Sequence, residues 1–360
     1  MSNLLYHPDW EEARARANHW WRGGDLGRAA MQVYAPQDPP WEILSPLPKP
    51  ESWVTDYSTG DLAYHVYVRL RNASATACFG EVAPCVNPGD LAPNCLALYL
   101  GCQGVESPGT VWCEPFLNEP LPPEFCHDPE NFYWRFTLEA IEQTLEQARG
   151  KVLIQFPDLI EGLDTLAAMR GTEQLLCDLV ERPEWVQACL RQITDRYFHY
   201  YDILYDLIRD EVGGSVFWAW APGRMAKFQC DVSAMISPGM FREFMVPVLE
   251  EMTERVSYCM YHWDGPGAIP HLETLLSIPQ LDMIQWTPGA NIEPCAHPRW
   301  WPLFHQVLDA GKKLLLIGVG KDELSTLKKE FGVQSKQMLL NVYVPHQSEG
   351  EEVLRMMELD

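Results

Sequence analysis

The sequence predicts an α/β fold, a (β/α)8 TIM-type barrel with an N-terminal helical and loop-rich extension. From residue 129 onward, strand-sized apolar runs alternate with segments of helical periodicity at least five times. The sequence has no G-x-G-x-x-G after an early strand, no Walker loop and no G-x-S-x-G elbow, so other common α/β folds are disfavoured. The 360 residues suit a single domain, 1–360, with an irregular part over 1–128 that supplies the first strands and regular repeats over 129–360.

The N-terminal part is predicted to contain one surface helix and two long irregular stretches. Residues 9–22 have helical spacing, with Asp9 as the cap, Glu12 completing a capping box, and two glycines after the end. Residues 35–50 are rich in Pro and Trp, and residues 79–123 are rich in Pro, Gly and Cys. Loops of this length in a compact domain are usually functional.

The regular part is predicted element by element from periodicity, with Ser237 as a helix cap and Pro183 in a first helical turn. Strands are expected over 152–156, 215–220, 258–262, 281–286, 313–318 and 338–344. Helices are expected over 129–149, 162–170, 183–210, 238–256, 268–276, 300–310, 322–331 and 349–359.

Composition limits the partners. With 27 Lys plus Arg against 50 Asp plus Glu, the formal charge of −23 would repel phosphates, so we expect a small-molecule substrate and no nucleic acid. No run approaches the roughly 20 apolar residues of a membrane span. The start of the chain lacks a signal-peptide pattern, and eleven cysteines without a CxxC pair favour the cytoplasm. Tyr197, Tyr200, Tyr201 and Tyr205 on one long helix would permit a homodimer.

His262 and Asp264 are the first candidates for catalysis. They lie two residues apart at the end of a predicted strand, and the carboxyl ends of strands carry the active site in β/α barrels. A histidine and a carboxylate can form an acid/base pair or supply two ligands to zinc. The structural alternative is that Asp264 caps the helix near residue 268 and that His262 is a core histidine.

Four further residues could contribute ionisable groups. Asp158 follows another predicted strand, and Cys230 and Asp231 could add a thiolate and a carboxylate beside His262. Glu114 follows a short apolar run and could lie at the cleft. For Asp158 and Asp231, a role as a helix or turn cap is the alternative.

Four tryptophans are predicted to contact the ligand, although barrel core is the alternative for each. Aromatic rings at strand ends can stack on a planar or sugar-like ligand or receive a cation. The residues are Trp218, Trp220, Trp263 and Trp286.

The run CDVSAMISPGMFREFMVP over 230–247, followed by His262, resembles the uroporphyrinogen decarboxylase superfamily, which includes corrinoid-dependent methyltransferases. In that superfamily a turn with Asp and Ser precedes a Ser-Pro-x-x-Phe-x-x-Phe-x-x-Pro helix, and the next strand ends in a His near the substrate. The similarity extends over about 130–358 in element order and is closest over 230–265. It implies a (β/α)8 barrel with its site at the mouth.

The resemblance also implies cofactors. Zinc methyltransferases of the superfamily use a His-x-Cys pair and a later Cys, where this chain has His262-x-Asp264 and no Cys after Cys295. A zinc site would then use His262, Asp264 and Cys230, and the corrinoid would be carried by a partner protein. The Arg-Gln-Ala-Gly-Arg segment of the decarboxylases has no equivalent at residues 20–24, which indicates a divergent branch.

Three hypotheses of function follow. The first is methyl transfer involving a corrinoid protein or a related one-carbon carrier. The second is a decarboxylase-type lyase on a small acid, in which Asp231 or Asp264 protonates the carbanion and Arg224 holds the carboxylate. The third is a non-catalytic protein that binds a sugar-like or aromatic ligand in the tryptophan cleft.

Overall fold

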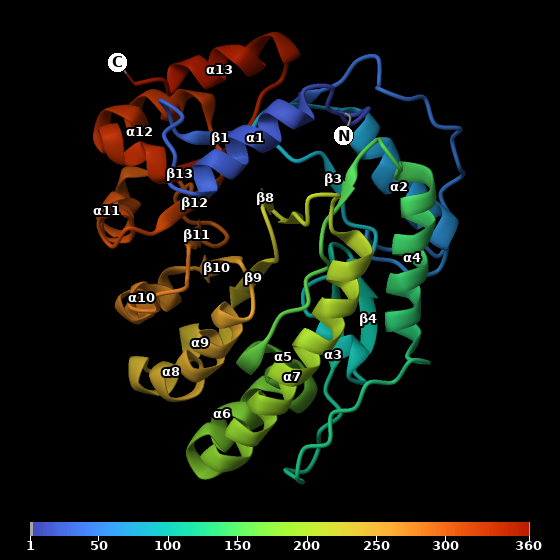
Figure 1. Ribbon diagram of the computed structural model, residues 1–360. Coiled ribbons are helices and arrows are strands. Elements are labelled where there is room, and N and C mark those ends of the chain that lie inside the picture. The colour runs from blue at the N-terminus through green and yellow to red at the C-terminus, as the bar shows by residue number, and fades with distance from the viewer. Residues whose placement is uncertain (1–2, 360) are drawn as a thin grey trace.

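The computed structural model describes residues 3–359 as a mixed α/β fold around a largely parallel central sheet (Figure 1). Its strand order is β2-β1-β13-β12-β11-β10-β9, with only β2 antiparallel to its neighbour. The strands are β1 (Ala30–Pro36), β2 (Thr76–Gly80), β9 (Met225–Gln229), β10 (Tyr258–Asp264), β11 (Met283–Thr287), β12 (Lys313–Val319) and β13 (Met338–Tyr343).

Three two-stranded ladders complete the strands of the described chain. A parallel pair joins β3 (Cys85–Val86) to β6 (Leu153–Ile154), and antiparallel hairpins join β4 (Gln103–Ser107) to β5 (Thr110–Glu114) and β7 (Ser215–Phe217) to β8 (Ala219–Ala221). A single hydrogen bond, from Phe156 N to Val216 O at 3.0 Å, links the segment after β6 to β7. Within residues 3–359 the ladders do not close into a ring, so the architecture is compatible with a TIM-type fold but closure is not detected.

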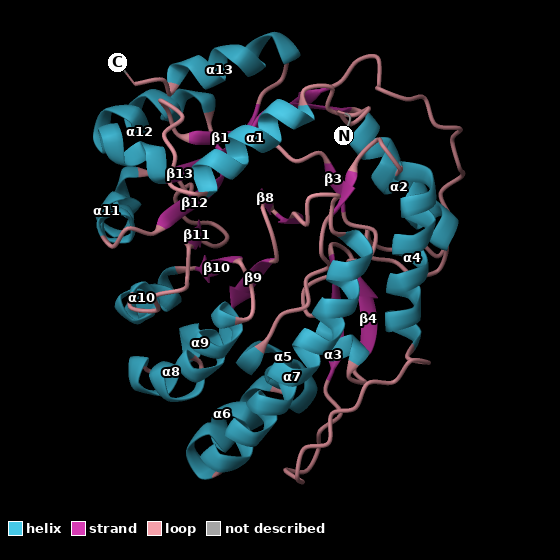
Figure 2. Cartoon of the chain, in the orientation of Figure 1, coloured by secondary structure: helices cyan, strands magenta, loops and turns pink. Residues whose placement is uncertain are grey.

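The helices lie on the outer side of the strands (Figures 1 and 2). In the C-terminal half, strand and helix alternate as the sequence predicts, so each helix covers the sheet beside the strand before it. The helices are α1 (Trp10–Trp21), α2 (Leu62–Ser74), α3 (Cys95–Tyr99), α4 (Phe132–Ala148), α5 (Gly162–Arg170), α6 (Thr172–Glu181), α7 (Pro183–Ile208), α8 (Pro238–Phe244), α9 (Val246–Glu254), α10 (Leu272–Leu276), α11 (Trp301–Asp309), α12 (Leu324–Phe331) and α13 (Gly350–Met356).

Several predicted elements differ from the structure for local reasons. The expected strand 215–220 is a tight hairpin that reverses at Trp218, and the expected helix 238–256 breaks at Met245 between α8 and α9. Asp9 precedes α1 but makes no side-chain cap bond, whereas Ser237 accepts a hydrogen bond from Met240 N at 3.2 Å as predicted. The strand β9 and the helix α6 were not expected from periodicity.

The tyrosines that suggested a dimer surface do not form one. Tyr197, Tyr200 and Tyr201 lie on the face of α7 that is buried in the hydrophobic core. Tyr205, on the same helix, packs against the edge of that core. All eleven cysteines are free thiols. Among residues 3–359, no helix has both the length and the apolar character needed to cross a membrane.

Candidate active site at the strand ends

Strand alternation builds a polar row on the inner face of three neighbouring strands. His262 on β10 pairs in register with Gln229 on β9 and with Gln285 on β11. Because successive side chains point to opposite faces, the residues between the polar ones face the covering helices. Six polar residues make up the row: Lys227, Gln229, His262, Asp264, Gln285 and Thr287.

Asp231, His262 and Asp264 form a three-ligand group at the carboxyl ends of β9 and β10. One donor atom from each residue lies within 4.8 Å of the others. Oδ1 of Asp264 is buried and has no hydrogen-bond partner, which is costly for a carboxylate unless a cation or proton satisfies it. Two carboxylate oxygens and an imidazole nitrogen suit zinc or another divalent ion of intermediate hardness.

The tautomer of His262 is fixed by Gln285. Nδ1 of the imidazole contacts the amide oxygen Oε1 of Gln285, and because that oxygen only accepts, Nδ1 carries the proton. The amide nitrogen of Gln285 donates to Trp286 O at 2.8 Å and Thr287 Oγ1 at 2.9 Å, which holds the amide in this orientation. Nε2 of His262 is therefore left with its lone pair for a ligand. Burial, and then the charge of Lys227, lower the pKa of His262.

Asp164 at the start of α5 holds the turn that presents Asp231. Its carboxylate accepts hydrogen bonds from Asp231 N at 2.7 Å, Val232 N at 3.0 Å and Gln229 Nε2 at 3.2 Å. Gln229 Nε2 also donates to Asp231 Oδ2 at 3.1 Å. Burial of the carboxylate and the neighbouring charges of Asp164 and Asp264 raise the pKa of Asp231 to about 7, although the residue as a whole is exposed.

A buried ion pair lies beneath these acids. Lys227 has no exposed side-chain surface, and its Nζ lies 2.6 Å from Asp158 Oδ1. Asp158 N donates to Asp90 Oδ1 at 3.1 Å, and burial together with the Asp158 charge raises the pKa of Asp90 to about 6. Burial raises the pKa of Glu161 well above its usual range, and its Oε2 has no hydrogen-bond partner. Acids thus outnumber the single lysine in this part of the site.

Trp218 contacts the site from the tip of the β7–β8 hairpin. Its φ of 52° lies in the left-handed region, which is strained for a bulky residue. Its indole meets the His262 ring edge to face at 5.4 Å, and Lys227 Nζ lies 5.8 Å from its centre. Bonds from Trp218 N to Gln155 Oε1 at 3.0 Å and from Gln32 Nε2 to Trp218 O at 2.8 Å fix the tip. Backbone strain of this kind is often kept where a side chain must be aimed at a ligand.

The structure brings together His262, Asp264, Asp231 and Trp218, with Asp158 one layer below. The alternative role of these acids as caps is not seen: neither Asp158 nor Asp264 caps the following helix, and the turn at Asp231 has no side-chain cap. The interpretation of these acids as helix caps is therefore wrong.

Cys230, Trp263 and Trp286 lie on the other face of the strands. Cys230 is buried in the hydrophobic core, its thiol is absent from the ligand group, and burial raises its pKa well above the usual range. Trp263 and Trp286 are fully buried, with ring centres 4.6 Å apart, and Trp263 donates to Ala268 O at 2.8 Å. They pack the sheet against its helices. The prediction that Trp263 and Trp286 contact the ligand is therefore wrong, because each is one residue away from a polar residue of the inner face and points to the opposite side.

Trp220, Arg224 and Glu114 are not members of the ligand group. Trp220 donates to Asp210 Oδ2 at 2.8 Å and packs on Trp10 of α1. Arg224 precedes β9, at the end opposite His262, where it pairs with Asp202. Glu114 is exposed on β5, and no contact in the described chain joins it to the triad.

Sequence reasoning missed four residues of the site: Lys227, Gln229, Gln285 and Asp164. A period-2 pattern could have found the first three, because a Lys and two Gln alternate with buried aromatics in short apolar runs. Asp164 had no such signal, since an acid in the first turn of a helix is ordinary.

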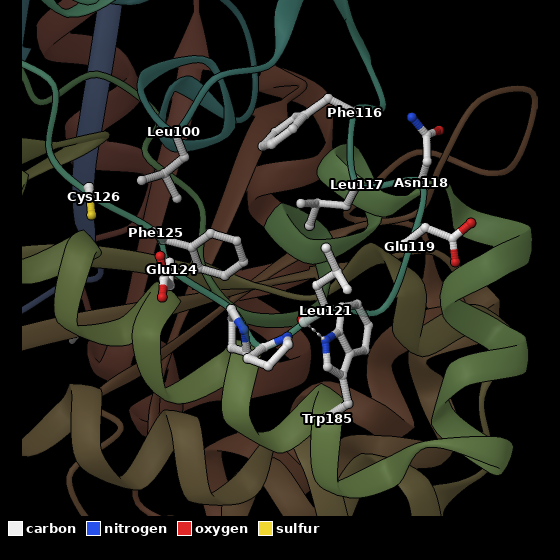
Figure 3. Close-up of a pocket in the computed structure, with 12 residues that line it drawn as sticks. Leu100, Phe116, Leu117, Asn118, Glu119, Leu121, Glu124, Phe125, Cys126 and Trp185 are labelled. Carbon is white, nitrogen blue, oxygen red and sulfur yellow. Dashed lines mark hydrogen bonds between the residues drawn. The ribbon is translucent and has the colours of Figure 1, made fainter.

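Two cavities of the molecule are candidate places for a substrate. One of about 510 Å³ lies between β5, α5 and the turn after β9, and includes Asp231, Asp164 and Gln229. Another of about 430 Å³ lies under the loop 116–126 (Figure 3), where Trp185 donates to Leu121 O at 2.6 Å. The second cavity has Glu119 and Glu124 on its wall but none of the triad, so the first is the one that serves the strand ends.

No family model matches the chain, and no curated protein matches it. Seven chains among solved structures match in fold. One of them is a methyltransferase from Methanosarcina mazei, with 13% sequence identity, coverage of 96% of both chains and a TM-score of 0.57. At this identity the likeness describes the fold.

Proposed function

We propose that the chain is a methyl-transfer enzyme that works with a corrinoid protein or a related one-carbon carrier. In this proposal its strands form a closed barrel, and Asp231, His262 and Asp264 hold a zinc ion at the mouth. The observation that carries it is the buried, unpartnered Oδ1 of Asp264 beside the free Nε2 side of His262. The fold of the methanosarcinal methyltransferase supports the same class.

The residues present fit a divalent ion. When bound, a zinc ion supplies a Lewis acid that lowers the pKa of an acceptor thiol or hydroxyl. The chain's own residues orient the ligand atoms: Gln285 fixes His262, Asp164 fixes the Asp231 turn, and Trp218 covers the imidazole. Lys227 balances one negative charge in the layer below.

Metal analysis tests the centre. We expect wild-type protein purified without chelator to carry about one equivalent of zinc, and His262→Ala and Asp264→Asn to lose most of it. His305→Ala, at a histidine that contacts Glu330 on α12, is the matched control and should keep the metal. Stoichiometric zinc in both site variants would show that the ion binds elsewhere.

Transfer is tested with free methylcobalamin and a thiol. The methyl group would move from cobalt to thiolate sulfur, giving a thioether and cob(I)alamin, which is followed by its visible spectrum. We expect turnover with wild type and loss of at least about 100-fold with Asp264→Asn, because this variant loses most of the zinc that would activate the acceptor. No transfer to any thiol or alcohol by zinc-loaded protein would reject methyl transfer.

A lyase is the second candidate, favoured by the raised pKa of Asp231, which suits a proton donor near neutral pH. Its weakness is that Arg224 lies at the far end of β9 and cannot hold the carboxylate. The third hypothesis, a binding protein with an aromatic cleft, loses support because only Trp218 of the four tryptophans reaches the site. Decarboxylation by chelator-treated protein would favour the lyase.

A further inference from the structure

The charged side chains that line the cavity of about 510 Å³ beside Asp231 are all acidic. Its wall is formed by the loop before α3, by β5, by α5 and the start of α6, and by the turn after β9. Among the described residues that line it, Asp164 and Asp231 are the only charged ones, and no Lys, Arg or His is present. Within residues 3–359, neither acid forms an ion pair with Lys or Arg closer than 4.0 Å.

The rim of this cavity is apolar and exposed. Trp112 on β5 is 65% exposed and Met235 after β9 is 53% exposed, and both line the cavity. An indole ring and a thioether are surfaces on which methyl groups pack well, and the ring also attracts a cation. Large apolar side chains left in solvent at the edge of an acidic cavity point to an occupant that covers them.

We propose that this cavity binds a methylated cation, a quaternary ammonium or sulfonium group, with its charge toward Asp164 and Asp231 and its methyl groups against Trp112 and Met235. An anionic acceptor such as a carboxylate or sulfonate would meet two carboxylates without a compensating cation. The inference rests on the proposed methyl transfer for the idea that the bound molecule gives a methyl group to the carrier and leaves as a neutral amine or thioether, which is the opposite direction to the methylcobalamin assay. The charge preference follows from the wall itself.

We expect the cavity to prefer a cation even when a divalent ion is bound by the three-ligand group of Asp231, His262 and Asp264. Such an ion would offset the charges of Asp231 and Asp264, while Asp164 is not among the three ligands and keeps its own. The three hydrogen bonds to Asp164 come from neutral donors, so they satisfy its oxygens without cancelling its charge. Burial raises the pKa of both Asp164 and Asp231, so the cavity is negative in both metal states once the pH exceeds these raised values.

Calorimetry with three probes of equal shape tests the charge preference. Choline is the cation, 3,3-dimethylbutan-1-ol is its neutral isostere, and 3,3-dimethylbutanoate is the anion, each titrated into full-length protein with zinc and after chelation. We expect choline to bind about 10-fold more tightly than the neutral isostere and the anion to bind least. Equal affinity of choline and the alcohol, or tighter binding of the anion, would overturn the proposal.

Variants locate the binding. Trp112→Ala should weaken choline about 5-fold, and Asp164→Asn about 10-fold with the alcohol affected less. Phe132→Ala, another exposed aromatic outside the cavity, should change nothing. Because Asp164→Asn also alters the turn, a thermal melt accompanies it, and Trp112→Ala tests the same claim without that risk. Unchanged choline affinity in Trp112→Ala would place the cation elsewhere.

The outcomes separate this inference from the proposed function. Choline binding with the expected order but no methyl transfer to any thiol would leave the cation site standing and reject the transfer. Transfer from methylcobalamin to an anionic thiol without measurable choline binding would reject the cation site and leave the transfer standing.

Discussion

At the scale of single residues, His262 depends on Gln285 for its orientation. The amide oxygen of Gln285 keeps the proton on Nδ1, and Trp286 O and Thr287 Oγ1 keep the amide from turning over. Loss of a residue that hydrogen-bonds to a metal-binding histidine usually weakens metal binding by about 10- to 100-fold.

We therefore expect Gln285→Leu to weaken zinc binding by about 10- to 100-fold because the imidazole loses its fixed tautomer. Competition with a chelating dye measures the change. Gln280→Leu, an exposed glutamine just before the same strand, is the control and should bind zinc as wild type does. Wild-type affinity in Gln285→Leu would show that His262 is not a ligand.

At the scale of elements, the hairpin β7–β8 aims one side chain at the cost of strain. Trp218 stands alone at the tip, between the facing pair Phe217 and Ala219, with a φ of 52°. Glycine adopts this conformation without the Cβ clash that costs other residues about 1–2 kcal/mol.

Comparing two truncations isolates that strain. Trp218→Gly and Trp218→Ala both remove the indole, so we expect the glycine variant to be more stable to urea by about 1 kcal/mol despite its more flexible unfolded chain. If the alanine variant were the more stable one, the tip would not be strained. Both variants should bind zinc more weakly than wild type because His262 loses its aromatic cover.

Prediction from sequence succeeded where an element is long and periodic. The helices α5 and α7 and the strands β12 and β13 lie within a few residues of their expected bounds, because a 3.6-residue or period-2 apolar pattern marks them. The hairpin 215–221 escaped because its strands are three residues long and uniformly buried, so no alternation distinguishes a turn from a strand. The strand β9 escaped because it is only five residues long, so its alternation of polar and apolar residues is brief.

The site was predicted in part for the same reason. His262 and Asp264 were found from their position at a strand end, and they do lie beside Asp231. Cys230 was chosen for its chemistry and Trp263 for its place near a strand end, although their odd spacing from Asp231, His262 and Asp264 puts them on the opposite face. The role of Asp164 arises from a tertiary contact between α5 and the turn after β9, which no local pattern encodes.

At the scale of the whole molecule, the acids at the mouth couple folding to pH. The pKa of Asp231 rises from 3.8 to about 7, so the native state keeps a proton that the unfolded chain releases between these values. This stabilisation is complete below pH 3.8 and is lost as pH rises through about 7. His262 acts in the opposite sense: its lowered pKa gives stability above pH 6.5 that is lost as pH falls.

The contribution of Asp231 can be measured as a difference. In chelator-treated protein, we expect Asp231→Asn to lose less unfolding free energy than wild type between about pH 5 and about pH 7.5, because the variant cannot release the proton. Urea titrations at the two pH values provide the comparison. Glu142→Gln, at an exposed position on α4, should follow wild type. A steeper loss in Asp231→Asn would contradict the raised pKa.

The tryptophans behind the strands have a consequence for how such a protein can change. Trp263, Trp286 and Trp300 form a continuous stack, with neighbouring ring centres 4.6 and 5.0 Å apart, that joins β10 and β11 to the segment before α11. Every second residue along these strands therefore packs against the helices. The residues between them face the inner side, and they can change without disturbing that packing. Evolution could exchange one set of ligand side chains for another on the inner face and keep the same packed scaffold.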